Sequence, residues 1–160
     1  MPKLGLISLG CAKNLVDSEH MLSLMRDAGW EITEDMSEAD VGVVNTCGFL
    51  SSANEEAIEN ILAMAELKKA GKLKKILVTG CMTQRYQGEV AKELPEVDGI
   101  LGCGSYGEIV SAVDDVLGGD RPRRFGDING ELEELGRVLT TPDYYAYLKI
   151  AEGCNNRCHY

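Results

Sequence analysis

The chain has 160 residues, 44% hydrophobic and 26% charged, which suits one globular domain of ordinary size with a true core. No stretch approaches 18 consecutive apolar residues, so the sequence predicts no membrane span, and Met1-Pro2-Lys3 leads into the first apolar run without a secretory leader. A net charge of −10 repels phosphates and disfavours a main nucleic-acid platform. Six cysteines without a leader indicate a reducing, cytoplasmic setting, where ligands or catalytic thiols are more common than disulfides.

Short apolar runs alternate with amphipathic segments along the first 119 residues. The runs predict strands over residues 3–9, 30–33, 41–45, 74–79 and 98–101. The amphipathic segments predict helices over residues 14–28, 52–70, 83–93 and 105–117. In the second helix, the expected core-facing residues are Ile58, Ile61, Leu62 and Ala65. This alternation predicts an α/β, three-layer, Rossmann-like domain with a mainly parallel sheet of about five strands.

The composition changes after this domain. Residues 120–142 are charged, contain Gly and Pro, and lack periodicity, so we interpret them as a linker, with a short strand pair within it as the alternative. Residues 143–160 are expected to begin a second domain, with a strand over residues 144–152.

Three of the predicted strands lead into a cysteine, and each cysteine precedes a predicted helix. These residues are Cys11, Cys47 and Cys81. Because the carboxyl ends of parallel strands share one edge, the three thiols are expected to meet there, close to electropositive helix N-termini. By itself the pattern leaves packing thiols and a shared metal both open. The paired knuckles typical of structural zinc are absent, and three thiolates would leave a fourth metal position free.

Cys103 lies within Gly102-Cys103-Gly104-Ser105-Tyr106-Gly107, which matches G-x-G-x-x-G. A dinucleotide site needs a following strand with an acidic residue about 20 positions on, and the predicted linker occupies that region. We therefore predict a tight turn, a helix cap at Ser105 and a packing role for Cys103.

The C-terminal residues 154–160 read Cys-Asn-Asn-Arg-Cys-His-Tyr. C-x₃-C with an aromatic residue two positions later resembles the start of the C-x₃-C-x₂-C motif of radical S-adenosylmethionine enzymes. The resemblance implies that Cys154 and Cys158 ligate a [4Fe–4S] cluster whose third ligand would follow Tyr160, and that Tyr160 packs near the adenine of S-adenosylmethionine. It gives His159 no ligand role.

Both halves together resemble the methylthiotransferases over the whole chain. The motifs are Gly10-Cys11, Asn14, Asp17-Ser18-Glu19, Asn45-Thr46-Cys47, Thr79-Gly80-Cys81 and the C-terminal cysteine pair. Residues 8–19 look like the RimO type, which methylthiolates the β-carbon of an aspartate in a small-subunit ribosomal protein. Ala12 departs from the proline common there. A tRNA adenosine methylthiotransferase of the same family and a non-catalytic zinc or thiol module remain as alternatives.

The resemblance implies two [4Fe–4S] clusters in the complete enzyme, one held by Cys11, Cys47 and Cys81 and carrying the sulfur to be transferred. It also implies S-adenosylmethionine as methyl donor and radical source, further domains of the same chain as partners, and no catalytic side chain among these residues. Asn14 and Ser18 are expected either to support the cluster loop by hydrogen bonds or to be ordinary helix-start residues. Asp17 and Glu19 are expected to be solvated or capping. These 160 residues alone are expected to be apo and inactive.

Overall fold

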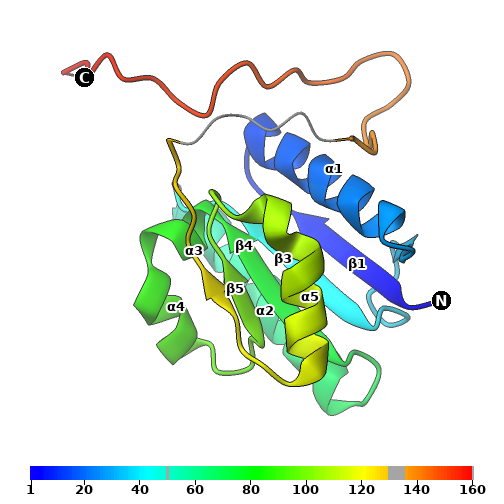
Figure 1. Cartoon of the computed structure of the whole chain (residues 1–160). Coiled ribbons are helices and arrows are strands. Elements are labelled where there is room, and N and C mark those ends of the chain that lie inside the picture. The colour runs from blue at the N-terminus through cyan, green and yellow to red at the C-terminus, as the bar shows by residue number, and fades with distance from the viewer. Residues whose placement is uncertain (50, 130–135, 160) are drawn as a thin grey trace.

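The computed structural model describes residues 1–49, 51–129 and 136–159 (Figure 1). Its strands are β1 (Lys3–Ser8), β2 (Glu31–Thr33), β3 (Val41–Thr46), β4 (Lys75–Gly80), β5 (Gly99–Leu101) and β6 (Arg123–Arg124). Its helices are α1 (Ala12–Asp27), α2 (Ser51–Lys69), α3 (Cys81–Arg85), α4 (Gln87–Glu93), the 3₁₀ turn η1 (Tyr106–Glu108) and α5 (Ile109–Gly118).

The strands form one six-stranded sheet in the order β2-β1-β3-β4-β5-β6, and every pairing is parallel. The predicted α/β class and parallel sheet are confirmed, with six strands where about five were expected. The additional strand, β6, lies in the segment predicted to be a linker and pairs with β5 through Ile100↔Arg123 and Leu101↔Arg124. With two residues and no apolar alternation, β6 left no pattern in the sequence.

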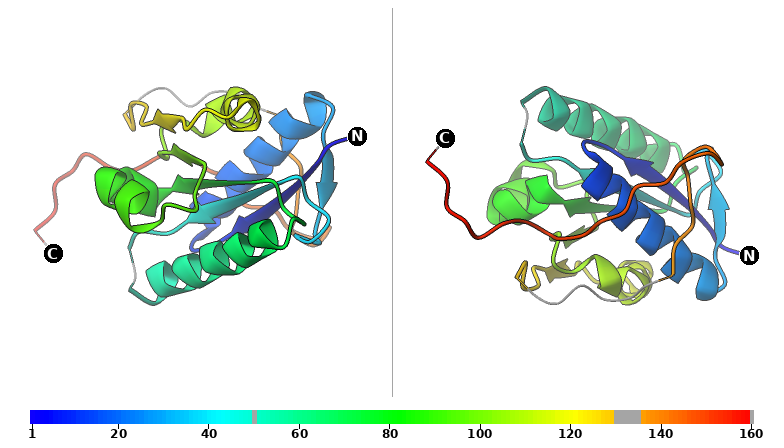
Figure 2. Two further views of the ribbon diagram at one scale, coloured as in Figure 1. Left: turned by 90° about the horizontal axis from the view of Figure 1, so that it is seen from below. Right: turned by 90° about the horizontal axis from the view of Figure 1, so that it is seen from above.

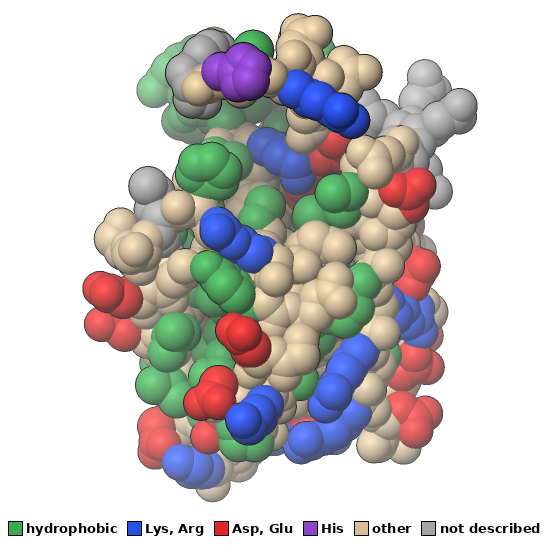
Figure 3. Space-filling model, turned by 90° about the vertical axis from the view of Figure 1, so that its left-hand side faces the viewer, with side chains coloured by type: hydrophobic (Ala, Val, Ile, Leu, Met, Phe, Trp, Pro, Cys, Tyr) green, Lys and Arg blue, Asp and Glu red, His purple; other side chains and the backbone are tan. Residues whose placement is uncertain are grey.

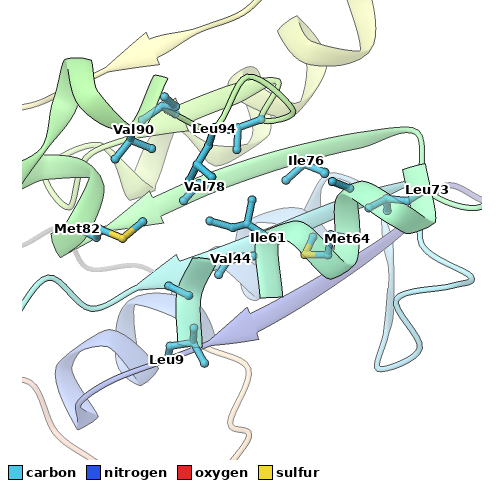
Figure 4. Close-up of a cluster of buried hydrophobic side chains, with 14 of the residues drawn as sticks. Leu9, Val44, Ile61, Met64, Leu73, Ile76, Val78, Met82, Val90 and Leu94 are labelled. Carbon is cyan, nitrogen blue, oxygen red and sulfur yellow. The ribbon is translucent and has the colours of Figure 1, made fainter. Parts of the chain in front are cut away.

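Helices cover both faces of the sheet and give three layers (Figures 1 and 2). On one face, α1 and α5 pack through Met21, Met25, Ala112 and Val116 against strand residues such as Leu77. On the other face, α2, α3 and α4 cover Val44, Ile76 and Val78 (Figure 4). Strand residues are buried from both sides, which explains why the strands read as continuous apolar runs.

The buried face of α2 differs from the prediction. Ile61 and Ala65 are in the core, but Ile58 and Leu62 are 39% and 45% exposed. The remaining buried positions are Ala53, Ala57 and Met64. Two overlapping apolar stripes exist on this helix, and the sheet selects the one that carries the smaller alanines and so permits closer packing.

Three local predictions are wrong. The helix expected over residues 83–93 is broken at Tyr86 into α3 and α4. Ser105 does not cap a helix with its side chain, because its Oγ accepts a hydrogen bond from Gly126 N at 2.7 Å. Residues 144–152 form no strand within the described part of the chain.

The strand order fixes where a ligand site belongs. The chain passes from β1 to the edge strand β2 and then returns to β3 on the other side of β1, so the topological switch point lies between β1 and β3. Crevices at such a point, at the carboxyl ends of the strands, are where open α/β sheets bind ligands. Within the described ranges, no helix is long and apolar enough to cross a membrane.

Candidate functional site

The strands β1, β3 and β4 end level with one another. Ser8 pairs with Asn45, Asn45 with Thr79, and Thr46 with Gly80. Cys11, Cys47 and Cys81 follow these ends within three residues, so the register itself gathers the three cysteines at one edge of the sheet.

The three cysteines line one cavity of ≈ 1330 Å³. Its wall also includes Cys103, Lys13 and Cys154. Cys47 is buried, Cys81 and Cys103 are half-buried, and Cys11 and Cys154 are exposed, all as free thiols. The cavity therefore joins the sheet edge to the C-terminal segment, which overhangs the domain with a hollow beneath it (Figure 3).

Two glycines allow the cysteine loops to approach so closely. Gly10 has φ +93°, and a β-carbon there would lie 2.6 Å from Cys47 Cβ. Gly80 has φ +104° and ψ −160°, a region open essentially to glycine alone, and a β-carbon there would collide with Thr46 O and lie 2.5 Å from Asn45 Oδ1. Any side chain at either position would push the loops apart.

Buried amides and hydroxyls tie the loops together. Asn14 Nδ2 donates to Leu9 O at 3.1 Å and to Thr46 O at 2.8 Å, and Cys81 Sγ lies 3.7 Å from Asn14 Oδ1. Asn45 Nδ2 donates to Asn14 O and to Ser18 Oγ, at 2.8 and 2.9 Å. Ser18 in turn bonds Ser8 Oγ at 2.8 Å. Asn14 and Ser18 are thus placed as supports of the loops, and Asn45, which the sequence gave no role of its own, lies between them.

Cys103 stands apart from its predicted packing role, since it lines the cavity beside Cys81. Strands β4 and β5 are paired neighbours, and Thr83 Oγ1 donates to Leu101 O at 2.5 Å across their ends. The neighbouring Cys81 thiol lowers the pKa of Cys103, while the Cys103 thiol and burial raise the pKa of Cys81. The sequence could not reveal that Cys81 and Cys103 are neighbours, because this depends on which strands lie side by side in the sheet.

The acidic residues of α1 are not solvated, contrary to expectation. Asp17 and Glu19 are 3% and 0% exposed. Both carboxylates accept contacts from the C-terminal segment, from Lys149 and Arg137 respectively. Sequence periodicity could not predict this, because the partners lie more than a hundred residues away.

The C-terminal motif is only partly gathered into the site. Cys154 lines the cavity and Cys158 is exposed. Tyr160 lies outside the described residues.

The donor set fits an iron–sulfur cluster in kind. Thiolates are the ligands such clusters use, and the charge of Lys13 at the cavity wall opposes the neighbouring Cys103 thiol and the burial that raise the pKa of Cys81. Within residues 1–49, 51–129 and 136–159, no three His, Cys, Asp or Glu side chains are already arranged as a closed ligand set. The thiols thus share a cavity without forming a closed ligand set.

Comparison with known proteins decides the family. The family model described as "Uncharacterized protein family UPF0004" matches residues 3–102, which include the three strand-end cysteines. The chain belongs to this family. The match covers β1 to β5 and includes Cys11, Cys47 and Cys81, and it ends before Cys103 and the C-terminal residues that complete the cavity wall.

Curated relatives carry a more specific name. The chain is 55% identical over 159 residues to "Ribosomal protein uS12 methylthiotransferase RimO" of Lachnoclostridium phytofermentans, covering 99% of this chain and 36% of that protein. It is 51% identical over 162 residues to the protein of the same name from Desulforamulus reducens, and 47% identical over 161 residues to that of Clostridioides difficile, covering 100% of this chain and 36% of each. The predicted resemblance to RimO-type methylthiotransferases is confirmed. The chain spans about a third of the length of the curated relatives it matches.

Proposed function

We propose that this chain is part of a radical S-adenosylmethionine enzyme that methylthiolates the β-carbon of an aspartate in ribosomal protein uS12. The observation that carries the proposal is the shared cavity of Cys11, Cys47, Cys81 and Cys154. The names of relatives that are 45–55% identical support the activity and the substrate.

In this proposal Cys11, Cys47 and Cys81 ligate an auxiliary [4Fe–4S] cluster. Three thiolates leave one iron without a protein ligand, as in catalytic metal sites that keep one position open. Cys154 and Cys158, with a further cysteine, would ligate the second cluster, and Tyr160 would pack near S-adenosylmethionine. When bound, these groups supply the transferable sulfur, the methyl group and the radical chemistry.

The chain's own residues orient the ligands. Asn14, Asn45 and Ser18 fix the three loops by buried hydrogen bonds, and Gly10 and Gly80 let the loops approach. A net charge of −10 favours a basic protein substrate over the phosphates of tRNA. We place the reaction in the cytoplasm, where reduced thiols persist.

Anaerobic reconstitution with iron and sulfide tests the cluster. We expect a brown chain with about 4 Fe, lost in Cys47→Ala and retained in the matched control Cys158→Ala. Tight stoichiometric zinc binding without iron uptake would instead establish a non-catalytic zinc module.

The substrate requires the complete protein, supplied with uS12 and with tRNA in parallel. A mass increase of one methylthio group on a uS12 aspartate supports the proposal. Modification of an anticodon-loop adenosine, with uS12 unchanged, would assign the tRNA activity of the same family.

A further inference from the structure

A buried carboxylate on α1 anchors the start of residues 136–154, a segment that we call the strap. Glu19, whose side chain is 0% exposed, accepts hydrogen bonds from Arg137 Nε at 2.6 Å, Thr140 N at 2.7 Å and Thr140 Oγ1 at 2.9 Å. Its backbone carbonyl accepts a fourth from Val138 N at 3.1 Å. Both carboxylate oxygens are thus used by the strap.

A second anchor lies two residues earlier on the same helix. Asp17 Oδ1 is 2.6 Å from Lys149 Nζ, and Asp17 Oδ2 is 2.8 Å from Lys13 Nζ. Glu152 closes the group, since it contacts Lys13 at 3.0 Å and also pairs with Lys149. The side chains of Asp17 and Lys149 are only 4% and 7% exposed, and Lys149 also lies over the Tyr106 ring at 4.9 Å.

Buried charges are stable only when they are paired and hydrogen-bonded, so these contacts form a specific docking site on α1. The group alternates two lysines and two carboxylates. Lys13 and Asp17 belong to α1, and Lys149 and Glu152 belong to the strap. Figures 1 and 2 show the resulting path, in which the strap crosses above α1 and continues toward the C-terminus.

The two anchors on α1 also determine how the strap lies relative to the cavity. Helix α1 begins at Ala12, directly after Cys11, so Asp17 lies about 9 Å along the same rigid helix. On the strap, Glu152 precedes Cys154 by two residues, and both residues line the cavity with Cys11. The helix therefore sets the separation between the two cysteine groups.

We propose that Asp17 and Glu19 are positioning residues that hold the C-x₃-C segment over the cavity of Cys11, Cys47 and Cys81. This inference rests on the proposed function for its purpose, because the groups that the two sets of cysteines would hold serve one reaction. The docking itself needs no metal, so it can be tested on the metal-free 160-residue chain.

The test compares Asp17→Asn and Glu19→Gln with the matched control Glu59→Gln, an exposed carboxylate on α2. Hydrogen exchange reports docking, because the amides of Val138 and Thr140 donate to Glu19. Loss of a charge-assisted bond should accelerate exchange of Thr140 at least about tenfold in Glu19→Gln and leave the control unchanged.

A second measurement tests how close Cys154 lies to Cys11. It uses a short bifunctional maleimide as cross-linker under reducing, metal-free conditions. Wild type should give a Cys11–Cys154 cross-link by mass spectrometry, and both variants should give less while their thermal unfolding resembles that of the control. Cross-linking and exchange equal to wild type in both variants would overturn the inference.

If an α1 variant fails to fold, two variants of strap residues still test the inference. Arg137→Met and Lys149→Met leave α1 intact and should lose the cross-link to a similar degree, with iron uptake by Cys11, Cys47 and Cys81 preserved. If these variants still take up iron and their Cys11–Cys154 cross-link is unchanged, the docking inference is wrong and the proposed function stands. Normal docking without iron uptake in the wild type sinks the proposed function alone.

Discussion

Two backbone positions decide how closely the cysteine loops can meet. Gly10 and Gly80 both have positive φ, and both face Asn45, Thr46 or Cys47 of the neighbouring loop. The shape of the site therefore depends on these glycines as well as on the thiols, because the neighbouring loop occupies the space that a β-carbon would fill.

At Gly80, substitution by alanine should destabilise the domain by about 1–3 kcal/mol or more, because φ +104° with ψ −160° is strained for any other residue and Thr46 O occupies the space. Denaturant unfolding measures the loss, and reconstituted iron should fall in parallel.

The control for this substitution is Gly88→Ala. Gly88 lies in α4 with no atom within 4 Å of its missing β-carbon, so alanine there should be neutral or stabilise by about 0.5–1 kcal/mol. Equal effects at the two glycines would contradict the account of Gly80.

At the level of elements, α2 illustrates how a helix with two apolar stripes chooses a face. Ile61 is fully buried against the sheet, whereas Ile58, three residues earlier, is 39% exposed (Figure 4 labels Ile61). The same residue type on the same helix therefore experiences two environments.

This difference gives a matched pair of substitutions. Ile61→Ala should cost about 2–5 kcal/mol of unfolding free energy through lost burial and a cavity, and Ile58→Ala should cost well below that. Chemical denaturation of both variants measures the contrast. A larger loss at Ile58 would show that α2 buries the predicted stripe after all.

At the level of the whole molecule, Glu19 links the strap to the domain through its charge. Burial raises the pKa of Glu19, but hydrogen bonds from Thr140 and the pairing with Arg137 outweigh burial and lower it below the ordinary 4.5. Because the carboxylate form binds the strap, docking is fully present above the ordinary pKa and is lost as the pH falls through the lowered one.

We therefore expect the Thr140 amide resonance to stay constant from neutral pH down to about 4.5 and to move toward an undocked position at lower pH. In Glu19→Gln the resonance should start near the undocked position and lose this acid transition. An unchanged transition in the variant would assign it to another group.

The sequence by itself determined the α/β class, the parallel strands, most element positions and the edge at which Cys11, Cys47 and Cys81 gather. These features follow from local apolar periodicity and from the rule that parallel strands end at one edge. The whole-chain motifs also sufficed for the family, which the comparisons confirm.

Only the tertiary structure decided the sixth strand, the buried face of α2, the partner of Cys103 and the burial of Asp17 and Glu19. Each depends on contacts between residues distant in the chain, such as Glu19 with Arg137 or Asp17 with Lys149. Local patterns carry no information on such pairs, and a buried carboxylate resembles a solvated one in sequence because its countercharge is brought to it by the fold.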